Sequence, residues 1–170
     1  MTGLLDLIRV FIARLKGEAP EIPSPPNMLP WADIELIDNG ETCEIVIKNI
    51  PKPVLIQSCD FDTNSQDGFF DIGHSSVYIL NRAFIEEWAH VGAVISFRVM
   101  DNGQLIGRLH QIVEESFDNN GWYCVTRGMN CGYNDPWRIR LDDITGIVYF
   151  PLWTEFIEGK YLYVSDEEIK

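Results

Sequence analysis

Short stretches in which apolar and polar residues alternate recur along most of this chain, separated by turn-forming residues. Alternation of this kind is typical of β-strands with one face buried. Residues Asn39-Gly40 and Asn102-Gly103 are strong signals for two-residue hairpin turns between such strands. The sequence therefore predicts a mostly β protein, with strands at 32–38, 43–49, 53–58, 75–80, 93–100, 104–114, 121–127 and 144–151.

Two segments instead have the spacing of amphipathic helices. The first covers residues 2–16, where the apolar positions are Leu4, Leu5, Ile8, Phe11, Ile12 and Leu15. Arg9, Arg14 and Lys16 lie elsewhere on this helix, and Gly17 ends it. The second is a short helix from Arg82 to His90, in which Phe84, Ile85 and Trp88 share a face.

Proline marks the boundary between the first helix and the body of the protein. Residues 18–30 contain five prolines, which favours an extended and fairly stiff connector. We therefore divide the chain into a helical arm (1–17), a Pro-rich linker (18–30), a β domain (31–165) and a polar tail (166–170). The arm either docks on a partner protein or a membrane surface, or packs against its own domain.

Composition narrows the class of protein. The 170 residues suffice for one domain with its own core, and 46% of them are hydrophobic. The 13 Lys and Arg residues stand against 26 Asp and Glu residues, a net charge of −13, so the surface repels phosphate backbones and nucleic acid is not an expected partner. No apolar run reaches the ~20 residues of a transmembrane helix. Charges at Asp6, Arg9 and Arg14 also disfavour a secretory signal. The expected location is the cytoplasm, or an assembly built there.

The four cysteines do not indicate a metal site. Cys43, Cys59, Cys124 and Cys131 include no Cys-x-x-Cys pair, and no cluster of thiols and imidazoles accompanies them. We expect free, mostly buried thiols, with a Cys43–Cys59 disulfide as the alternative. No metal and no cofactor is predicted.

Polar and titratable residues occur among apolar neighbours in three segments, which span residues 60–74, 105–114 and 126–140. In the second segment His110 lies in the middle of a predicted strand, and it is the one histidine of three with buried-looking neighbours. Histidine is the usual base near neutral pH, and a serine hydroxyl needs such a base to become a nucleophile. Ser65 in the first segment and an acid in the third would complete a Ser-His-Asp site.

In their order along the chain, the three segments resemble the blocks of signal-peptidase-like serine proteases of the histidine-base type, a superfamily that includes the self-cleaving domains of LexA-type repressors. Asn64-Ser65-Gln66-Asp67-Gly68 matches the nucleophile loop, and His110-Gln111-Ile112-Val113-Glu114 matches the base-bearing strand. Thr126-Arg127-Gly128-Met129-Asn130, with Asp135-Pro136, is similar to the last block. Residues 91–95 and 141–150 are similar to flanking strands, so that the resemblance covers roughly residues 57–152.

The resemblance implies a coiled antiparallel sheet or partly closed barrel, and a peptidase that cleaves a protein partner or itself. Ser65 would be the nucleophile, His110 the base and Asp135 the acid that orients the imidazole. The chain departs from the pattern at Gln66 and Gly68, which replace Met and Pro. Met129 stands where the block normally has its acid. These departures support an alternative, a catalytically inactive docking module of a larger assembly. Because soluble members of the superfamily are often found in phages, the resemblance implies association with a phage particle.

Other residues of these segments admit more than one interpretation. His74 is either structural or an additional residue of the site. Asp60, Asp62, Asn64 and Asp71 have the spacing of a calcium loop, but Ser65 occupies the position that requires Gly. Ser65 is otherwise a simple turn residue. Core packing accounts for the aromatic residues near the third segment, which are Trp122, Tyr133 and Trp137.

Overall fold

The chain forms the predicted strands in a computed structural model that describes residues 31–49, 54–58, 65, 75–79, 82–152 and 161–164. The strands are β1 (Ile34–Asp38), β2 (Cys43–Ile47), β3 (Val54–Ser58), β4 (Ser75–Ile79), β5 (Val94–Asp101), β6 (Gln104–Asp118), β7 (Gly121–Arg127), β8 (Ile144–Leu152) and β9 (Tyr161–Val164). Helix α2 spans Arg82–Trp88, and short 3-10 helices cover Trp31–Asp33 and Leu141–Asp143. Strand β9 was not predicted. The helical arm, the Pro-rich linker and the polar tail lie outside the described residues.

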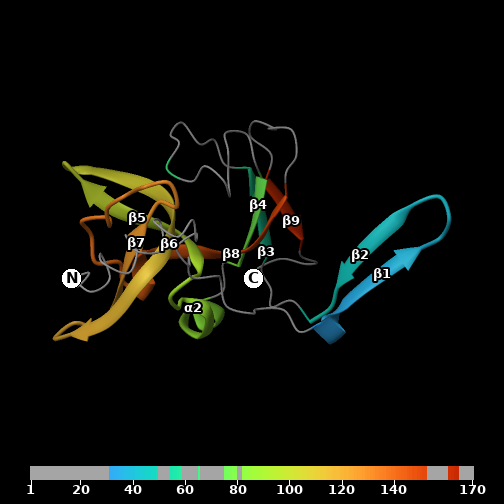
Figure 1. Ribbon diagram of the computed structural model, residues 1–170, viewed down its shortest axis with the longest axis horizontal. Coiled ribbons are helices and arrows are strands. Elements are labelled where there is room, and N and C mark those ends of the chain that lie inside the picture. The colour runs from blue at the N-terminus through green and yellow to red at the C-terminus, as the bar shows by residue number, and fades with distance from the viewer. Residues whose placement is uncertain are drawn as a thin grey trace, which may run out of the picture.

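Seven strands make one antiparallel sheet, in the order β7-β6-β5-β8-β4-β3-β9 (Figure 1). Strands β1 and β2 pair with each other in a second, two-stranded sheet. The mostly β, antiparallel prediction is therefore confirmed. Strands β7 and β9 lie at the two edges of the large sheet, and the described strands do not close it into a barrel.

The two predicted hairpin turns differ in length. Between β5 and β6 the turn consists of Asn102 and Gly103, both with positive φ, as a two-residue turn of type I′ requires. Between β1 and β2 the last paired residues are Asp38 and Cys43, so four residues form the turn. Here the prediction of a two-residue turn was wrong. The side-chain Oδ1 of Asn39 accepts hydrogen bonds from the backbone N–H groups of Glu41 and Thr42, and these bonds stabilise the longer turn.

The hydrophobic core lies where β5, β6 and β8 pack with α2. Its side chains include Ile85 of α2 and, in the strands, Ile95, Phe97, Ile112, Ile144 and Ile147. Burying each such side chain contributes about 1.5–3 kcal/mol of hydrophobic stabilisation, so this cluster holds the centre of the sheet together. Trp88 packs against the cluster from α2, as the helical spacing predicted, with its ring centroid 5.1 Å from that of Tyr149.

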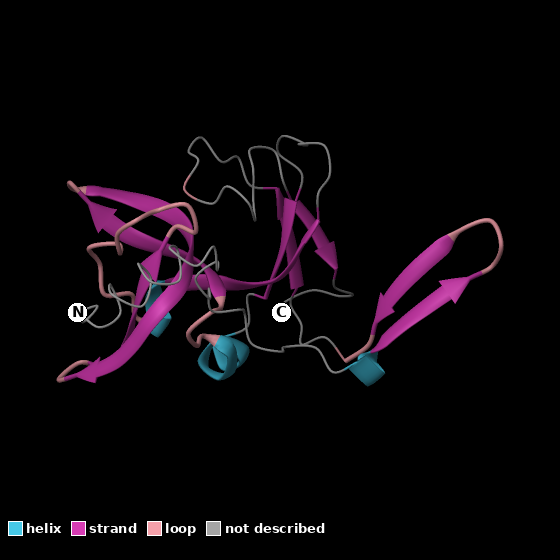
Figure 2. Cartoon of the chain, in the orientation of Figure 1, coloured by secondary structure: helices cyan, strands magenta, loops and turns pink. Residues whose placement is uncertain are grey.

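The β1–β2 hairpin lies apart from the seven-stranded sheet (Figures 1 and 2). Its register pairs Ile34 with Ile47 and Leu36 with Ile45, which places four apolar side chains on one face. Leu36 and Ile45 are nevertheless 67% and 70% exposed. Leu36 and Ile45 therefore form an exposed apolar surface, on a hairpin that is only marginally stable as a two-stranded unit.

Three of the four cysteines lie within the described residues, and all three are free thiols. Cys124 is buried and Cys131 is half-buried, whereas Cys43 is exposed on the β1–β2 hairpin. The alternative of a Cys43–Cys59 disulfide was therefore wrong.

Over the part of the chain that the structure describes, no helix is both long enough and apolar enough to cross a bilayer.

Candidate active site

The pairing of β6 with β5 holds His110 in the strand next to the edge strand β7. In that pairing His110 lies opposite Ile95, and its ring centroid is 6.4 Å from that of Phe97, in an edge-on arrangement. Because Ile95 and Phe97 are fully buried, the imidazole packs against the apolar core and only 9% of its side chain is exposed. The prediction of a buried strand histidine is confirmed.

A β-bulge lies three residues beyond His110. Ile112 pairs with Thr126 of β7, but the next residue of β7, Val125, pairs with Glu114, so Val113 is the extra residue of β6. Bulges bend a strand and change the direction of its side chains, and they are common beside active sites. This register brings Thr126 close to His110 on the buried side of the two strands.

Asp135 reaches His110 from the loop that follows β7. Its Oδ2 atom lies 2.6 Å from Nδ1 of His110 and 2.6 Å from the hydroxyl oxygen of Thr126. Its backbone N–H donates a hydrogen bond of 2.8 Å to the carbonyl oxygen of Thr126. The carboxylate side chain is 11% exposed, so its contact with the imidazole is largely shielded from solvent.

Ser65 completes the arrangement from a distant part of the sequence. Its Oγ atom lies 3.1 Å from Nε2 of His110. The carbonyl oxygen of Ser65 accepts a hydrogen bond of 2.9 Å from the backbone N–H of Asn130. The structure thus places all three predicted site residues in one hydrogen-bonded row, Ser65–His110–Asp135.

Glycine at position 128 allows this close approach. A Cβ atom built on Gly128 would lie 2.6 Å from the carbonyl oxygen of Ser65, 2.9 Å from its Cβ and 2.9 Å from Sγ of Cys131. A larger residue at this position would force Ser65, Cys131 or the loop itself to shift. The loop that contains Asp135 therefore also determines where Ser65 lies.

The row has the donor and acceptor order that nucleophilic catalysis requires. An ionised carboxylate only accepts hydrogen bonds, so Nδ1 of His110 carries the proton that it donates to Asp135. Nε2 of the neutral imidazole is then an acceptor for the Ser65 hydroxyl. Met129 cannot supply the acid, and Asp135 occupies the place that an acid needs.

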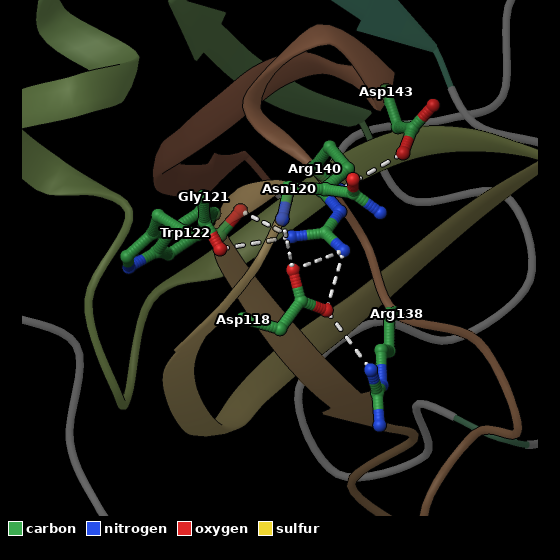
Figure 3. Close-up of polar contacts among 7 residues, drawn as sticks. All are labelled: Asp118, Asn120, Gly121, Trp122, Arg138, Arg140 and Asp143. Atoms are coloured by element: carbon green, nitrogen blue, oxygen red, sulfur yellow. Dashed lines mark hydrogen bonds and ion pairs between the residues drawn. The ribbon is translucent and has the colours of Figure 1, made fainter.

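A network of charged side chains fixes the far end of the same loop (Figure 3). Arg140 donates hydrogen bonds to both carboxylate oxygens of Asp118, at 3.0 and 2.7 Å, and to the carbonyl oxygens of Gly121 and Trp122. Arg138 also donates to Asp118, at 2.9 Å. The hydrogen bond from Arg140, joined by one from the backbone N–H of Asn120, lowers the pKa of Asp118 to about 2.

This network and a backbone bridge tie the end of the loop to β7. Cys124 and Ile139 exchange two backbone hydrogen bonds of 2.9 Å. Burial raises the pKa of the Cys124 thiol to about 12, so this cysteine is an inert part of the core. The segment with Asp135 is consequently held at both ends, by Thr126 and by the bridge at Ile139.

Core packing was predicted for three aromatic residues, and the structure confirms it for two of them. Trp122 and Trp137 pack against the core as expected, whereas Tyr133 is exposed and the expectation of core packing was wrong for it. Gln66, Gly68, His74 and the calcium-loop residues Asp60, Asp62, Asn64 and Asp71 lie outside the described residues.

The sequence alone indicated no role for Thr126 or Gly128. Both belong to the third polar segment of the sequence, residues 126–140, but the contacts that define their roles cross to Asp135 and Ser65. No known protein family, curated protein or solved structure matches this chain.

Proposed function

We propose that this protein is a serine peptidase of the signal-peptidase-like type that cleaves a protein partner or itself. The observation that carries the proposal is the hydrogen-bonded row in which Ser65 Oγ lies 3.1 Å from His110 Nε2, and His110 Nδ1 lies 2.6 Å from Asp135. Both distances are within the range at which a base takes a proton from a nucleophile and an acid orients the base. The shielding of His110 and Asp135 from solvent strengthens these contacts.

The chemistry would proceed in two stages. Ser65 Oγ attacks the scissile carbonyl carbon, and its proton passes to Nε2 of His110. When the tetrahedral intermediate collapses, the C–N bond breaks and His110 returns the proton to the leaving amine. Water then attacks the acyl-serine ester with His110 again as base, which releases the acid and restores Ser65. Asp135 holds the imidazole and stabilises its charged form in both stages.

The finer details of the proposal come from the sequence. The ordered blocks around Ser65, His110 and Thr126–Asp135 support the signal-peptidase-like sheet, and the resemblance supports association with a phage particle. The charged residues of the first segment and the lack of a long apolar run favour action in the cytoplasm. The substrate would be a peptide segment. Neither a metal nor a cofactor has a step in this chemistry.

The test combines intact-mass analysis of the protein and its co-expressed neighbours with cleavage of a proteome-derived peptide library. We expect Ser65→Ala and His110→Ala each to abolish nearly all cleavage, and the double variant to lose little more, because the two groups act as one unit. Asp135→Asn should cost less than either.

Two control variants change a serine and a histidine that lie outside the Ser65–His110–Asp135 row. Ser116→Ala removes another half-buried serine, and His90→Ala removes an exposed histidine that pairs with Glu115 at 3.2 Å. Both should keep wild-type cleavage. Identical fragment patterns in the wild type and Ser65→Ala would refute the peptidase proposal.

A second function is favoured by the exposed hairpin. Trp31, Leu36 and Ile45 present apolar surface on β1–β2 and the short helix before it, apart from the Ser65 row. Apolar surface of this kind is typical of an interaction site, which supports a catalytically inactive docking module in a larger assembly such as a phage particle. In that case the masses stay unchanged, and Leu36→Ser with Ile45→Ser abolishes incorporation into the assembly.

A further inference from the structure

Thr126 makes two contacts with the acid of the proposed site. Its side chain is fully buried in β7, and its hydroxyl donates a hydrogen bond of 2.6 Å to Oδ2 of Asp135. Its carbonyl oxygen accepts the backbone N–H of Asp135 at 2.8 Å. The same Oδ2 atom accepts the hydrogen bond from Nδ1 of His110 at 2.6 Å. One carboxylate oxygen is therefore held between a hydroxyl and an imidazole.

The position of Asp135 in the chain explains why such a hold is needed. Asp135 belongs to the loop between β7 and the short helix Leu141–Asp143, so no strand pairing fixes its side chain. Its backbone hydrogen bond fixes the main chain and leaves the two side-chain torsions free. Thr126, by contrast, lies in β7 opposite Ile112 of β6, two residues from His110. A β-branched side chain on a paired strand has a restricted χ1 angle, so its hydroxyl is a rigid reference point.

We propose that Thr126 is a positioning residue that locks the Asp135 carboxylate onto His110. The proposal rests on the proposed peptidase function, which it deepens. With Oδ2 held by the hydroxyl, Nδ1 of His110 keeps its proton on the side of Asp135. Nε2 is thereby kept as the acceptor that faces Ser65. The two hydrogen bonds of Thr126 go to Asp135, and Thr126 acts through that residue.

The test compares Thr126→Val, which removes the hydroxyl and keeps the branched shape, with Thr126→Ser, which keeps the hydroxyl. Cleavage of the proteome-derived peptide library gives kcat and KM for its best-cleaved peptide. NMR detects the Nδ1 proton of His110, whose short hydrogen bond to Asp135 shifts its signal strongly downfield. We expect Thr126→Val to lower kcat by up to about 100-fold, the cost of a misplaced catalytic group, with little change in KM. The downfield signal should disappear in Thr126→Val, and Thr126→Ser should restore both properties.

A double-variant experiment separates positioning from a purely structural role. In an Asp135→Asn background, Thr126→Val should cost little more activity if Thr126 acts through the carboxylate, because coupled residues are not additive. A full additional loss would overturn the proposal, as would a Thr126→Val protein with wild-type kcat and an intact downfield signal. If Thr126→Val does not fold, Thr126→Ala removes the same hydroxyl without crowding and is measured in the same way.

The two readouts also distinguish this proposal from the function on which it rests. If the wild-type protein cleaves nothing, the peptidase proposal fails, and the NMR comparison still decides whether Thr126 holds Asp135 on His110. If the wild type cleaves and Thr126→Val leaves the signal unchanged, the peptidase stands and the role of Thr126 is wrong.

Discussion

Replacing Gly128 by alanine should disconnect Ser65 from His110. The added Cβ would lie 2.6 Å from the carbonyl oxygen of Ser65 and 2.9 Å from its Cβ. Carbon atoms in contact normally lie about 3.5–4.0 Å apart, so the two carbon atoms would have to separate by roughly 0.6–1.1 Å. Two of the three atoms that would be hit belong to Ser65, and its backbone oxygen cannot turn away as a flexible side-chain end could. The displacement therefore falls on the nucleophile.

The size of the effect follows from the hydrogen bond that would be stretched. The Ser65 Oγ–His110 Nε2 distance is 3.1 Å, close to the upper end of the productive range of about 2.6–3.2 Å. A shift of several tenths of an ångström breaks it, and misplacement by about 1 Å can cost about 100-fold in rate. Overpacking of this kind also costs about 1–3 kcal/mol of stability. For a domain of this size each kcal/mol corresponds to roughly 2–4 °C in Tm, so Tm should fall by roughly 2–12 °C.

Gly132→Ala is the matched control because it lies in the same loop. A Cβ at Gly132 has no atom within 4 Å, and the backbone there is not left-handed. An alanine should therefore leave Tm unchanged or raise it slightly, by limiting the freedom of the unfolded chain. The assays are thermal unfolding, cleavage of the peptide library and the NMR signals of the His110 ring. Wild-type Tm and ring signals in Gly128→Ala would show that Ser65 does not lie against Gly128.

Two further predictions concern stability. The pKa of Asp118 is lowered to about 2 in the folded protein, so its carboxylate stabilises the fold above its ordinary pKa, and this contribution disappears as the pH falls from about 4 to about 2. Urea midpoints of the wild type and Asp118→Asn should differ by a constant amount above pH 5 and converge near pH 2; a difference that persists at pH 2 would contradict the ion pair with Arg140. Leu36→Ala on the exposed face of β1–β2 should change the free energy of unfolding by less than about 0.5 kcal/mol, whereas Ile147→Ala in the core, where the side chain is 0% exposed, should cost about 2–5 kcal/mol. A large loss in Leu36→Ala, measured by the same urea titration, would show that the hairpin face is buried in solution.

Much of the fold followed from local patterns in the sequence. Alternation of apolar and polar residues located β1 to β8, because the side chains of a strand point to opposite faces in turn. In β1 and β2 the alternation marks an apolar face that stays largely exposed. Asn102-Gly103 specified the β5–β6 turn, since both residues accept the positive φ angles of type I′. Strand β9 escaped prediction because its four residues are too short to show a period.

The order of motifs also identified the three residues of the candidate site, and it selected Asp135 once Met129 had been excluded as an acid. Sequence order cannot supply distances, however. Ser65 is 45 positions from His110, and Asp135 is 25 positions beyond it. Whether these side chains meet depends on strand register, on the bulge at Val113 and on how the loop after β7 packs.

Tertiary structure alone decided the residues that hold the site together. Thr126 and Gly128 carry no catalytic group, and their roles arise from contacts with Asp135 and Ser65 across the loop. The four-residue turn at Asn39 likewise depends on side-chain hydrogen bonds that a dipeptide signal does not encode. The sequence by itself determined which residue types were present and which segments would be extended. The packing of those segments decided which atoms came within hydrogen-bond distance, because such distances change with a shift of a single residue in register.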